Sequence, residues 1–269
     1  MMDQRRCPSS LAPSMEILDG TLIKGKRKVD AFVELHIEQG PRLEAEGAAI
    51  GVVQAIAAPA AMRVSFHGDG GHAGAQLMPL RNDASLAAAE LALQVEAAVL
   101  ATGLAGAPDT VGTVGRWDLS PNTVNSVPRE AALEIDIRDI DGSRRDKVVT
   151  TITEAAAAIA KRRKVRHDVA MVNQDAPATC GPEVTSAIAA SVEELGLSSI
   201  KLVSRAYHDA LFMAQIGPAG MIFIPCRNGW SHRPDEFSSP EAIENGVKVL
   251  ALTLARLASA QPVTDKKEL

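Results

Sequence analysis

The sequence predicts an α/β protein with a second, inserted α+β unit. Strand-like and helix-like segments alternate along most of its 269 residues, which is typical of helices packed on a sheet. From residue 62 to about residue 173 the order becomes β-α-β-β-α-β, as in a ferredoxin-like two-layer unit. The first pattern resumes over 178–262, so we expect the segments on both sides of the inserted unit to share one sheet.

The first half of the expected elements follows from apolar runs and breakers. The run AFVELHI from Ala31 predicts a strand that stops at Gln39-Gly40-Pro41. The apolar run 50–61 predicts one or two short strands. Alternation over 62–66 predicts a half-buried strand, which leads into a glycine-rich loop. Asn82-Asp83 can cap a helix over 84–100.

The second half is predicted in the same way. Residues 110–118 and the alternating residues 132–138 predict strands, and Gly142-Ser143 opens a helix that ends in the basic tract 161–164, where cations complement the helix dipole. Pro240 begins a closing helix with apolar residues at helical spacing. Between them we expect helices over 182–195 and 209–216 and strands over 200–204 and 220–225.

Composition limits the function classes. Hydrophobic residues make up 46% and charged residues 23% of the chain, as in globular proteins with a core. Because aromatic residues are only 3%, this core must consist of small aliphatic side chains. The net charge of −5 argues against nucleic acid as a partner, since binding it requires clustered positive charge.

Membrane and disulfide roles are not expected. No apolar run approaches the roughly 18–20 residues that span a membrane, and the N-terminus has no apolar segment of the secretory type. Three cysteines, Cys7, Cys180 and Cys226, are too few and too widely spaced for a disulfide framework or a thiolate metal site. We therefore interpret them as reduced, structural thiols.

Histidines are the first candidates for a functional site. His36 lies at a strand end, His232 follows a buried strand, and His72 lies in the loop Gly68–Gly74, where glycines let a backbone approach a ligand closely. His208 precedes Asp209, which can tether a ligand or cap a helix. For each of them a purely structural role remains open, and the loop spacing does not fit a dinucleotide-binding fingerprint.

Taken together, several motifs in a fixed order are similar to one enzyme family. They are His36-Ile-Glu-Gln-Gly-Pro41, Gly70-Gly-His-Ala-Gly74, Pro79-x-Arg81-Asn-Asp-Ala84, Gly112-Thr-Val-Gly115, Pro121-Asn-x-x-Asn125-x-Val-Pro128, Asp136-x-Arg138-Asp139, His208-Asp-Ala210 and Ser231-His-x-Pro234. The chain resembles, from about residue 31 to 260, the dinuclear metal amidohydrolases that cleave ureido groups. These include N-carbamoyl-L-amino-acid, allantoate and ureidoglycolate amidohydrolases. The segment Arg205–Ala210 most resembles the plant ureidoglycolate branch, with the allantoate enzymes as the nearest alternative.

The resemblance implies a domain organisation. An aminopeptidase-like catalytic domain, made of 31–59 and 176–262, would be interrupted by a lid and dimerisation domain over 60–175. Residues 1–30 would form an atypical lead-in and 263–269 a tail. A homodimer that pairs through the lid is implied as well, and a small-molecule ureide is the implied substrate.

The resemblance also implies site residues. Two manganese ions would be bound, with His36 and His232 at two ligand positions. Substrate positions fall on Gln39, His72, Asn125, Arg138 and His208, and His72 would act catalytically in the partner's site. Chemically, a metal-activated water can attack a ureido carbon, a guanidinium suits a substrate carboxylate, and His72 with Asn125 can stabilise an oxyanion.

One departure from the family pattern concerns the remaining metal ligands. The resemblance implies a His-x-Asp segment, a bridging Asp and a Glu-Glu pair, and these residues do not occur in the expected form here. We therefore expect that this chain alone cannot hold a dinuclear centre and is inactive, with exposed sheet edges. A non-catalytic dimerisation product is the alternative from another class.

The terminal Lys267-Glu-Leu269 loosely resembles an endoplasmic-reticulum retrieval signal. The family resemblance implies that compartment, and the cytoplasm is the alternative location.

Overall fold

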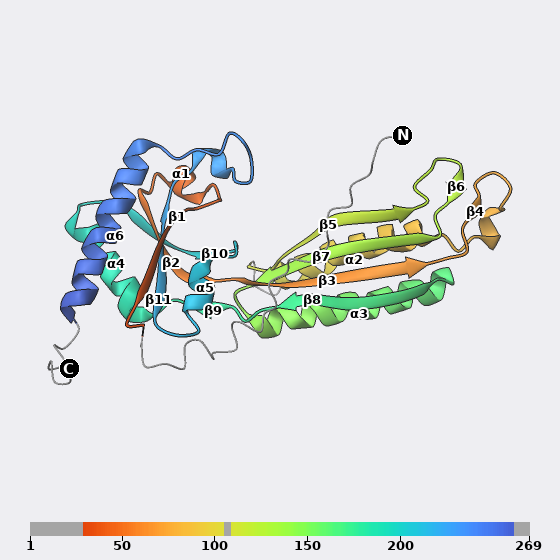
Figure 1. Cartoon of the computed structure of the whole chain (residues 1–269), viewed down its shortest axis with the longest axis horizontal. Helices are drawn as coiled ribbons and strands as arrows, with labels where there is room; N and C mark the ends of the chain where they lie inside the picture. The colour runs from red at the N-terminus through yellow and green to blue at the C-terminus, as the bar shows by residue number, and fades with distance from the viewer. Residues whose placement is uncertain (1–28, 105–108, 261–269) are drawn as a thin grey trace, which may run out of the picture.

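The computed structural model describes residues 29–104 and 109–260. It is elongated, with one sheet and its helices at each end of the long axis (Figure 1). Most of the predicted lead-in, Cys7 and the predicted tail 263–269 lie outside the described residues. The two sheets meet only at a narrow junction (Figure 1).

The first sheet is mixed. Its strands are β1 (Phe32–Ile37), β2 (Ile50–Ile56), β9 (Ala178–Thr179), β10 (Ser199–Ser204) and β11 (Ala219–Ile224). The order is β1-β11-β2-β10, with β9 paired to β2. β1 is parallel to β11 and β10 to β2, whereas β11 and β2 are antiparallel. Chain segments that precede and follow the inserted unit thus contribute to one sheet.

Helices flank this first sheet. They are α1 (Arg42–Glu46), α4 (Pro182–Glu194), α5 (Asp209–Met213) and α6 (Pro240–Ala260). One apolar cluster joins β2 and β11 to α4 and α6, and another joins them to α1 and α5. β11 is buried along its whole length, as expected for a central strand covered on both faces.

The second sheet is antiparallel and carries two long helices. Its strands are β3 (Ala58–His67), β5 (Val111–Ser120), β7 (Glu130–Asp139) and β8 (Arg166–Gln174), in the order β5-β7-β3-β8. α2 (Ala84–Leu104) and α3 (Gly142–Arg163) cover one face and share a single apolar core with the strands. The element order in this unit is therefore β-α-β-β-α-β, which the sequence predicts.

A small two-stranded ribbon projects from the far end of the second sheet (Figure 1). It pairs β4 (Gly71–His72) with β6 (Ser126–Val127), and the 3-10 helix η2 (Met78–Leu80) follows β4. Gly71 adopts a φ of 138°, which favours glycine. Glycine is also required at Gly68, where a Cβ would lie 1.9 Å from the carbonyl oxygen of Asn82.

Helix α2 is apolar on two faces. Ala84, Ala87, Ala88, Leu91 and Val95 face the core, whereas Leu86, Leu93 and Leu100 are exposed. By length and composition it is the one helix among the described residues that could cross a membrane. A core helix of a globular unit passes the same test, so this finding is weak evidence for a membrane role.

The sequence prediction missed several short elements. The strand predicted over 62–66 begins at Ala58, almost directly after β2, because the β3 backbone pairs with β7 from Ala58 onward. Helix α5 is shorter than predicted. α1, β4, β6 and β9 were not predicted, because their stability depends on tertiary contacts. For α1, the backbone N–H of Asn228, 184 positions further along the chain, donates to Glu44 Oε2 (2.6 Å).

The two described cysteines are structural. Cys180 and Cys226 are buried and free of disulfides. Burial raises the pKa of the Cys180 thiol to about 11 and also raises the pKa of Cys226. Both side chains are therefore thiols at neutral pH, which confirms the interpretation of these two residues as reduced, structural cysteines.

Candidate functional site

Two loops meet at the carboxyl ends of β1 and β11. Gln39 Nε2 donates to Ser231 Oγ (2.8 Å), although 192 positions separate the two residues. Ser231 Oγ in turn donates to Glu236 Oε2 (2.8 Å), which also accepts from the backbone N–H of His232 (3.1 Å). The Gln39–Ser231 hydrogen bond thus connects the loop after β1 to the loop that carries His232, and Glu236 holds Ser231 and His232 within that second loop.

The backbone of both loops is unusual at this contact. Gln39 and His232 adopt left-handed conformations, with φ of 56° and 58°. Gly229 has a φ of 67°, and a Cβ there would lie 2.5 Å from the carbonyl carbon of Gly40. Such conformations cost energy for residues other than glycine and gather at functional sites. The two loops can therefore approach this closely only with glycine at position 229.

A cleft of about 880 Å³ opens between these loops and the second sheet. Gln39 and His232 line it from the first sheet, and Thr113, Glu134 and Arg138 line it from strands β5 and β7. Three residues implied by the family resemblance, Gln39, Arg138 and His232, therefore share one cavity. Its volume suits a small molecule.

Arg138 is held in place but keeps free donors. Its Nε and Nη2 donate to the Asp136 carboxylate (2.7 Å for Nη2), and its Nη1 donates to the carbonyl oxygen of Arg205 (3.3 Å). A guanidinium has five N–H groups, so two of them are left by these three contacts. Arg138 can therefore bind a further anion in the cleft, although Asp136 already neutralises part of its charge.

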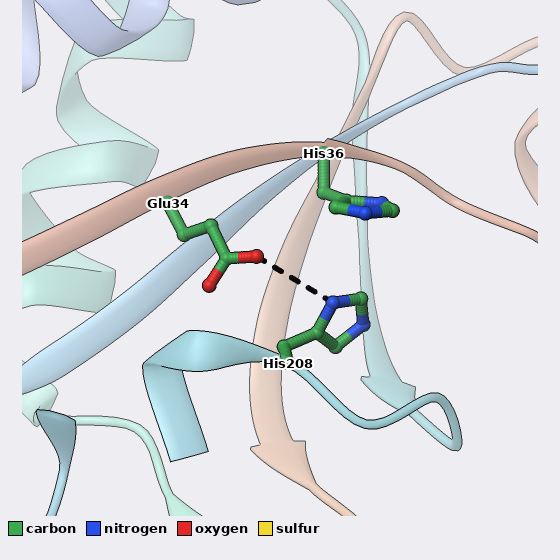
Figure 2. Close-up of side chains that lie close together, drawn as sticks. All are labelled: Glu34, His36 and His208. Carbon is green, nitrogen blue, oxygen red and sulfur yellow. Dashed lines mark ion pairs between the residues drawn. The ribbon is translucent and has the colours of Figure 1, made fainter. Parts of the chain in front are cut away.

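His36 lies on β1, next to two other polar side chains (Figure 2). Its Nδ1 lies 2.8 Å from the carbonyl oxygen of Ile37. Because a carbonyl only accepts, Nδ1 must carry the proton, which leaves the lone pair of Nε2 for a metal ion. His36 thus fits the role of a metal ligand.

His208 lies against His36 rather than in the wall of the cleft. Its ring centroid is 4.7 Å from that of His36, and the residue is only 5% exposed. Nδ1 of His208 lies 3.5 Å from Glu34 Oε1, and Nε2 lies 2.8 Å from Ser204 Oγ. Burial raises the pKa of Glu34, but the adjacent His208 side chain and a hydrogen bond from the Ala210 backbone N–H outweigh it, so that the pKa is lowered.

His72 and Asn125 lie together on the ribbon at the opposite end of the second sheet (Figure 1). Nδ1 of His72 accepts from the backbone N–H groups of Gly74 (3.1 Å) and Ala75 (3.2 Å). Nε2 must therefore carry the proton, which makes the exposed ring a hydrogen-bond donor. Within one chain this pair is remote from His36.

The described residues contain one group of at least three side chains that could hold a metal ion, namely Glu34, His36 and His208. His232, the second ligand that the resemblance implies, is not part of it. Sequence reasoning did not single out Glu34, Ser204 or Glu236. Glu34 is two residues before His36 on a strand, so both side chains point to the same face, and this spacing was the available signal.

Comparison with known proteins agrees with the fold and with these motifs. The chain matches Peptidase family M20/M25/M40 over residues 11–256, and it belongs to that family. It is 59% identical to "Ureidoglycolate hydrolase" of Arabidopsis thaliana over 85% of this chain and 48% of that protein.

Solved structures of similar enzymes share the fold of this chain. The crystal structure of AtUAH in complex with glyoxylate is 59% identical, with a TM-score of 0.80, over 85% of this chain and 54% of that one. An amidase of the hydantoinase/carbamoylase family from Burkholderia multivorans is 34% identical, with a TM-score of 0.81, over 89% and 57%. The chain spans about half the length of the curated relatives that it matches.

Proposed function

We propose that this chain carries part of the substrate and metal site of an amidohydrolase that cleaves ureido C–N bonds. The proposed reaction hydrolyses ureidoglycolate with one molecule of water to glyoxylate, two molecules of ammonia and carbon dioxide. The cleft shared by Gln39, Arg138 and His232 carries this proposal. The higher identity to a ureidoglycolate hydrolase than to a carbamoylase-family amidase, 59% against 34%, favours this substrate over N-carbamoyl amino acids.

The residues have complementary chemical roles in this proposal. Arg138 would bind the substrate carboxylate with its two remaining N–H groups, and Gln39 would orient the ureido group. His36 and His232 would help to hold divalent ions, Mn²⁺ by family resemblance, which lower the pKa of a bound water. The Nε2–H of His72, from a partner subunit, would donate to the oxygen of the scissile carbonyl.

The proposal is tested by calorimetric titration of the chain with ureidoglycolate, allantoate and an N-carbamoyl amino acid, together with an assay of ammonia release in Mn²⁺. We expect ureidoglycolate to bind most tightly, and the sequence predicts no turnover by these 269 residues alone. Tighter binding of allantoate or of the N-carbamoyl amino acid would contradict the substrate assignment. Turnover with stoichiometric manganese would contradict the predicted inactivity.

Arg138→Lys should weaken the binding of glyoxylate and ureidoglycolate by about 10- to 100-fold. A lysine ammonium cannot make the paired contacts of a guanidinium, and a hydrogen bond to a charged group contributes about 1.5–3 kcal/mol. Calorimetric titration measures the change. Arg116→Lys is the matched control, because Arg116 lines the same cleft but is exposed. Because both changes keep the positive charge, unchanged binding in Arg138→Lys would show that only the charge of the cleft matters. An equal loss in both variants would contradict a specific role of Arg138.

We also propose that the chain forms a homodimer through its second sheet. Strand β5 is an edge strand, and an edge can pair with its own copy around a two-fold axis. Beside it, Leu93, Leu100, Val111 and Trp117 line an apolar groove of about 480 Å³ between α2 and β5. A dimer would also bring the His72 ribbon of one subunit toward the cleft of the other.

Leu93→Glu should convert this dimer to a monomer. The side chain is 65% exposed, so the change costs little within one subunit but buries a charge in the dimer. Light scattering coupled to size-exclusion chromatography measures the mass. Leu254→Glu is the control and should remain dimeric, because Leu254 lies on α6 and is 48% exposed. A dimeric Leu93→Glu variant would exclude this surface.

A further inference from the structure

Glu34, His36 and His208 form a compact polar cluster at the first sheet. One ligand atom from each side chain lies within 4.8 Å of the others. Figure 2 shows the three side chains converging from β1 and from the residue that precedes α5. The side chain of His208 is 2% exposed and that of Glu34 is 17% exposed. Polar groups buried to this degree require compensation.

Surrounding hydrogen bonds leave one free lone pair on each of the first two residues. His36 donates through Nδ1 to the Ile37 carbonyl oxygen (2.8 Å), which leaves Nε2 free. The Oε2 atom of Glu34 accepts from the Ala210 backbone N–H (2.8 Å), which leaves Oε1 facing His208. Outer hydrogen bonds of this kind orient metal ligands and fix the histidine tautomer.

The third residue follows the same pattern. Ser204 Oγ lies 3.2 Å from the carbonyl oxygen of Ala206 and donates to it, so it accepts from Nε2–H of His208 at 2.8 Å. Nδ1 of His208 then faces Glu34 Oε1 at 3.5 Å as an ion pair, and a metal ion bound between them would displace the proton that they share. This distance exceeds a normal N–H···O hydrogen bond of about 2.7–3.2 Å. It matches the roughly 3.3–3.6 Å between two ligands of a tetrahedral ion with bonds of about 2.0–2.2 Å.

We propose that Glu34, His36 and His208 bind a single divalent transition-metal ion of the zinc type. Two imidazoles and one carboxylate form a donor set that such ions favour over calcium or magnesium. The proposed site shares only His36 with the dinuclear centre implied by the family resemblance. Glu34 and His208 are not ligands of that centre, and the site needs neither His232 nor any residue beyond the three.

Cobalt provides the test, because tetrahedral Co²⁺ has visible absorption bands that report its ligands. The chain, stripped of metal, is titrated with Co²⁺ and then with competing Zn²⁺. We expect one equivalent to bind with tetrahedral bands. Glu34→Gln and His208→Gln should each weaken binding at least about tenfold and alter the bands, since even outer-sphere changes cost about 10- to 100-fold. His232→Gln should bind within about twofold of the unaltered chain.

A stability measurement separates metal binding from folding. Each variant is melted without and with Zn²⁺, and the metal-dependent rise in Tm is compared with its own metal-free value. The rise should be lost in Glu34→Gln and His208→Gln and kept in His232→Gln. No binding by the unaltered chain, an equal loss in His232→Gln, or unchanged binding in Glu34→Gln and His208→Gln would each overturn the proposal. Ureide binding through Arg138 is measured separately, so failure here leaves the proposed function standing.

Discussion

Asp139→Ala will lower the free energy of unfolding by about 3–5 kcal/mol, as expected when one partner of a buried ion pair is removed. The Asp139 side chain is fully buried and accepts from Arg144 Nε (2.7 Å) and from the Asp141 backbone N–H (2.8 Å). It also accepts from the hydroxyl of buried Thr110. The variant leaves these donors without their acceptor. Urea denaturation at pH 7 measures the change.

The effect of Asp139→Ala should depend on pH. Burial alone would raise the pKa of the Asp139 carboxyl. Hydrogen bonds from Arg144, Thr110 and the Asp141 backbone N–H have the larger effect, so the pKa lies below its ordinary value. A lowered pKa in the folded state contributes stability above the unfolded pKa of about 3.9. That contribution is lost as the pH falls through the folded pKa.

The difference in the free energy of unfolding between the unaltered chain and Asp139→Ala should therefore have its full size at pH 7 and become smaller below about pH 4. Glu154→Ala, at an exposed position of α3, is the control and should change stability by less than about 0.5 kcal/mol at every pH. A difference that grows as the pH falls would contradict the proposed role of the carboxylate.

Much of the fold follows from local patterns that the sequence shows directly. In β7, Leu133, Ile135 and Ile137 are buried in the core, while Arg138 belongs to the opposite set and reaches the cleft. This alternation is a property of any strand with one buried face, so periodicity alone predicts both the strand and its polar side. The closing helix α6 is likewise predicted by apolar residues at helical spacing.

The arrangement of the candidate site depends on contacts that periodicity does not encode. Gln39 meets Ser231 because β1 lies parallel to β11 and the loops after both strands emerge at the same end of the sheet. His36 meets His208 because α5 packs against β1 and β11. Strand order and register are set by the whole sheet, so these proximities could not be derived from the spacing of residues along the chain.

Family resemblance named site residues, but one chain separates them into three places. Gln39, Arg138 and His232 share the cleft, His36 and His208 lie together beside Glu34, and His72 with Asn125 occupies the distant ribbon. Motif order along a sequence gives the identity of these residues and not their distances. A second subunit is the physical means by which the ribbon could join a cleft, which is why the dimer and the site are linked proposals.

Arg145→Ala will destabilise the junction between the two sheets, with an expected loss of about 3–5 kcal/mol. The residue is 3% exposed, and its Nη1 donates toward the carbonyl oxygens of Ala58 (3.2 Å), Pro59 (3.4 Å) and Asp175. Ala58 and Asp175 mark the two places where the chain passes between the sheets. A hydrogen bond to a charged donor contributes about 1.5–3 kcal/mol. Loss of several such hydrogen bonds therefore weakens the two crossings, the places at Ala58 and Asp175 where the chain passes between the sheets.

Two measurements check this prediction. Urea denaturation gives the loss in stability, and limited proteolysis should cleave the variant faster near Ala58 and Asp175, because cleavage follows local opening of the backbone. Lys147→Ala removes a cation two residues away on the exposed face of α3 and is the matched control. If cleavage increases equally throughout the variant, Arg145 stabilises the fold as a whole. Cleavage confined to the two crossings identifies it as the residue that holds the junction together.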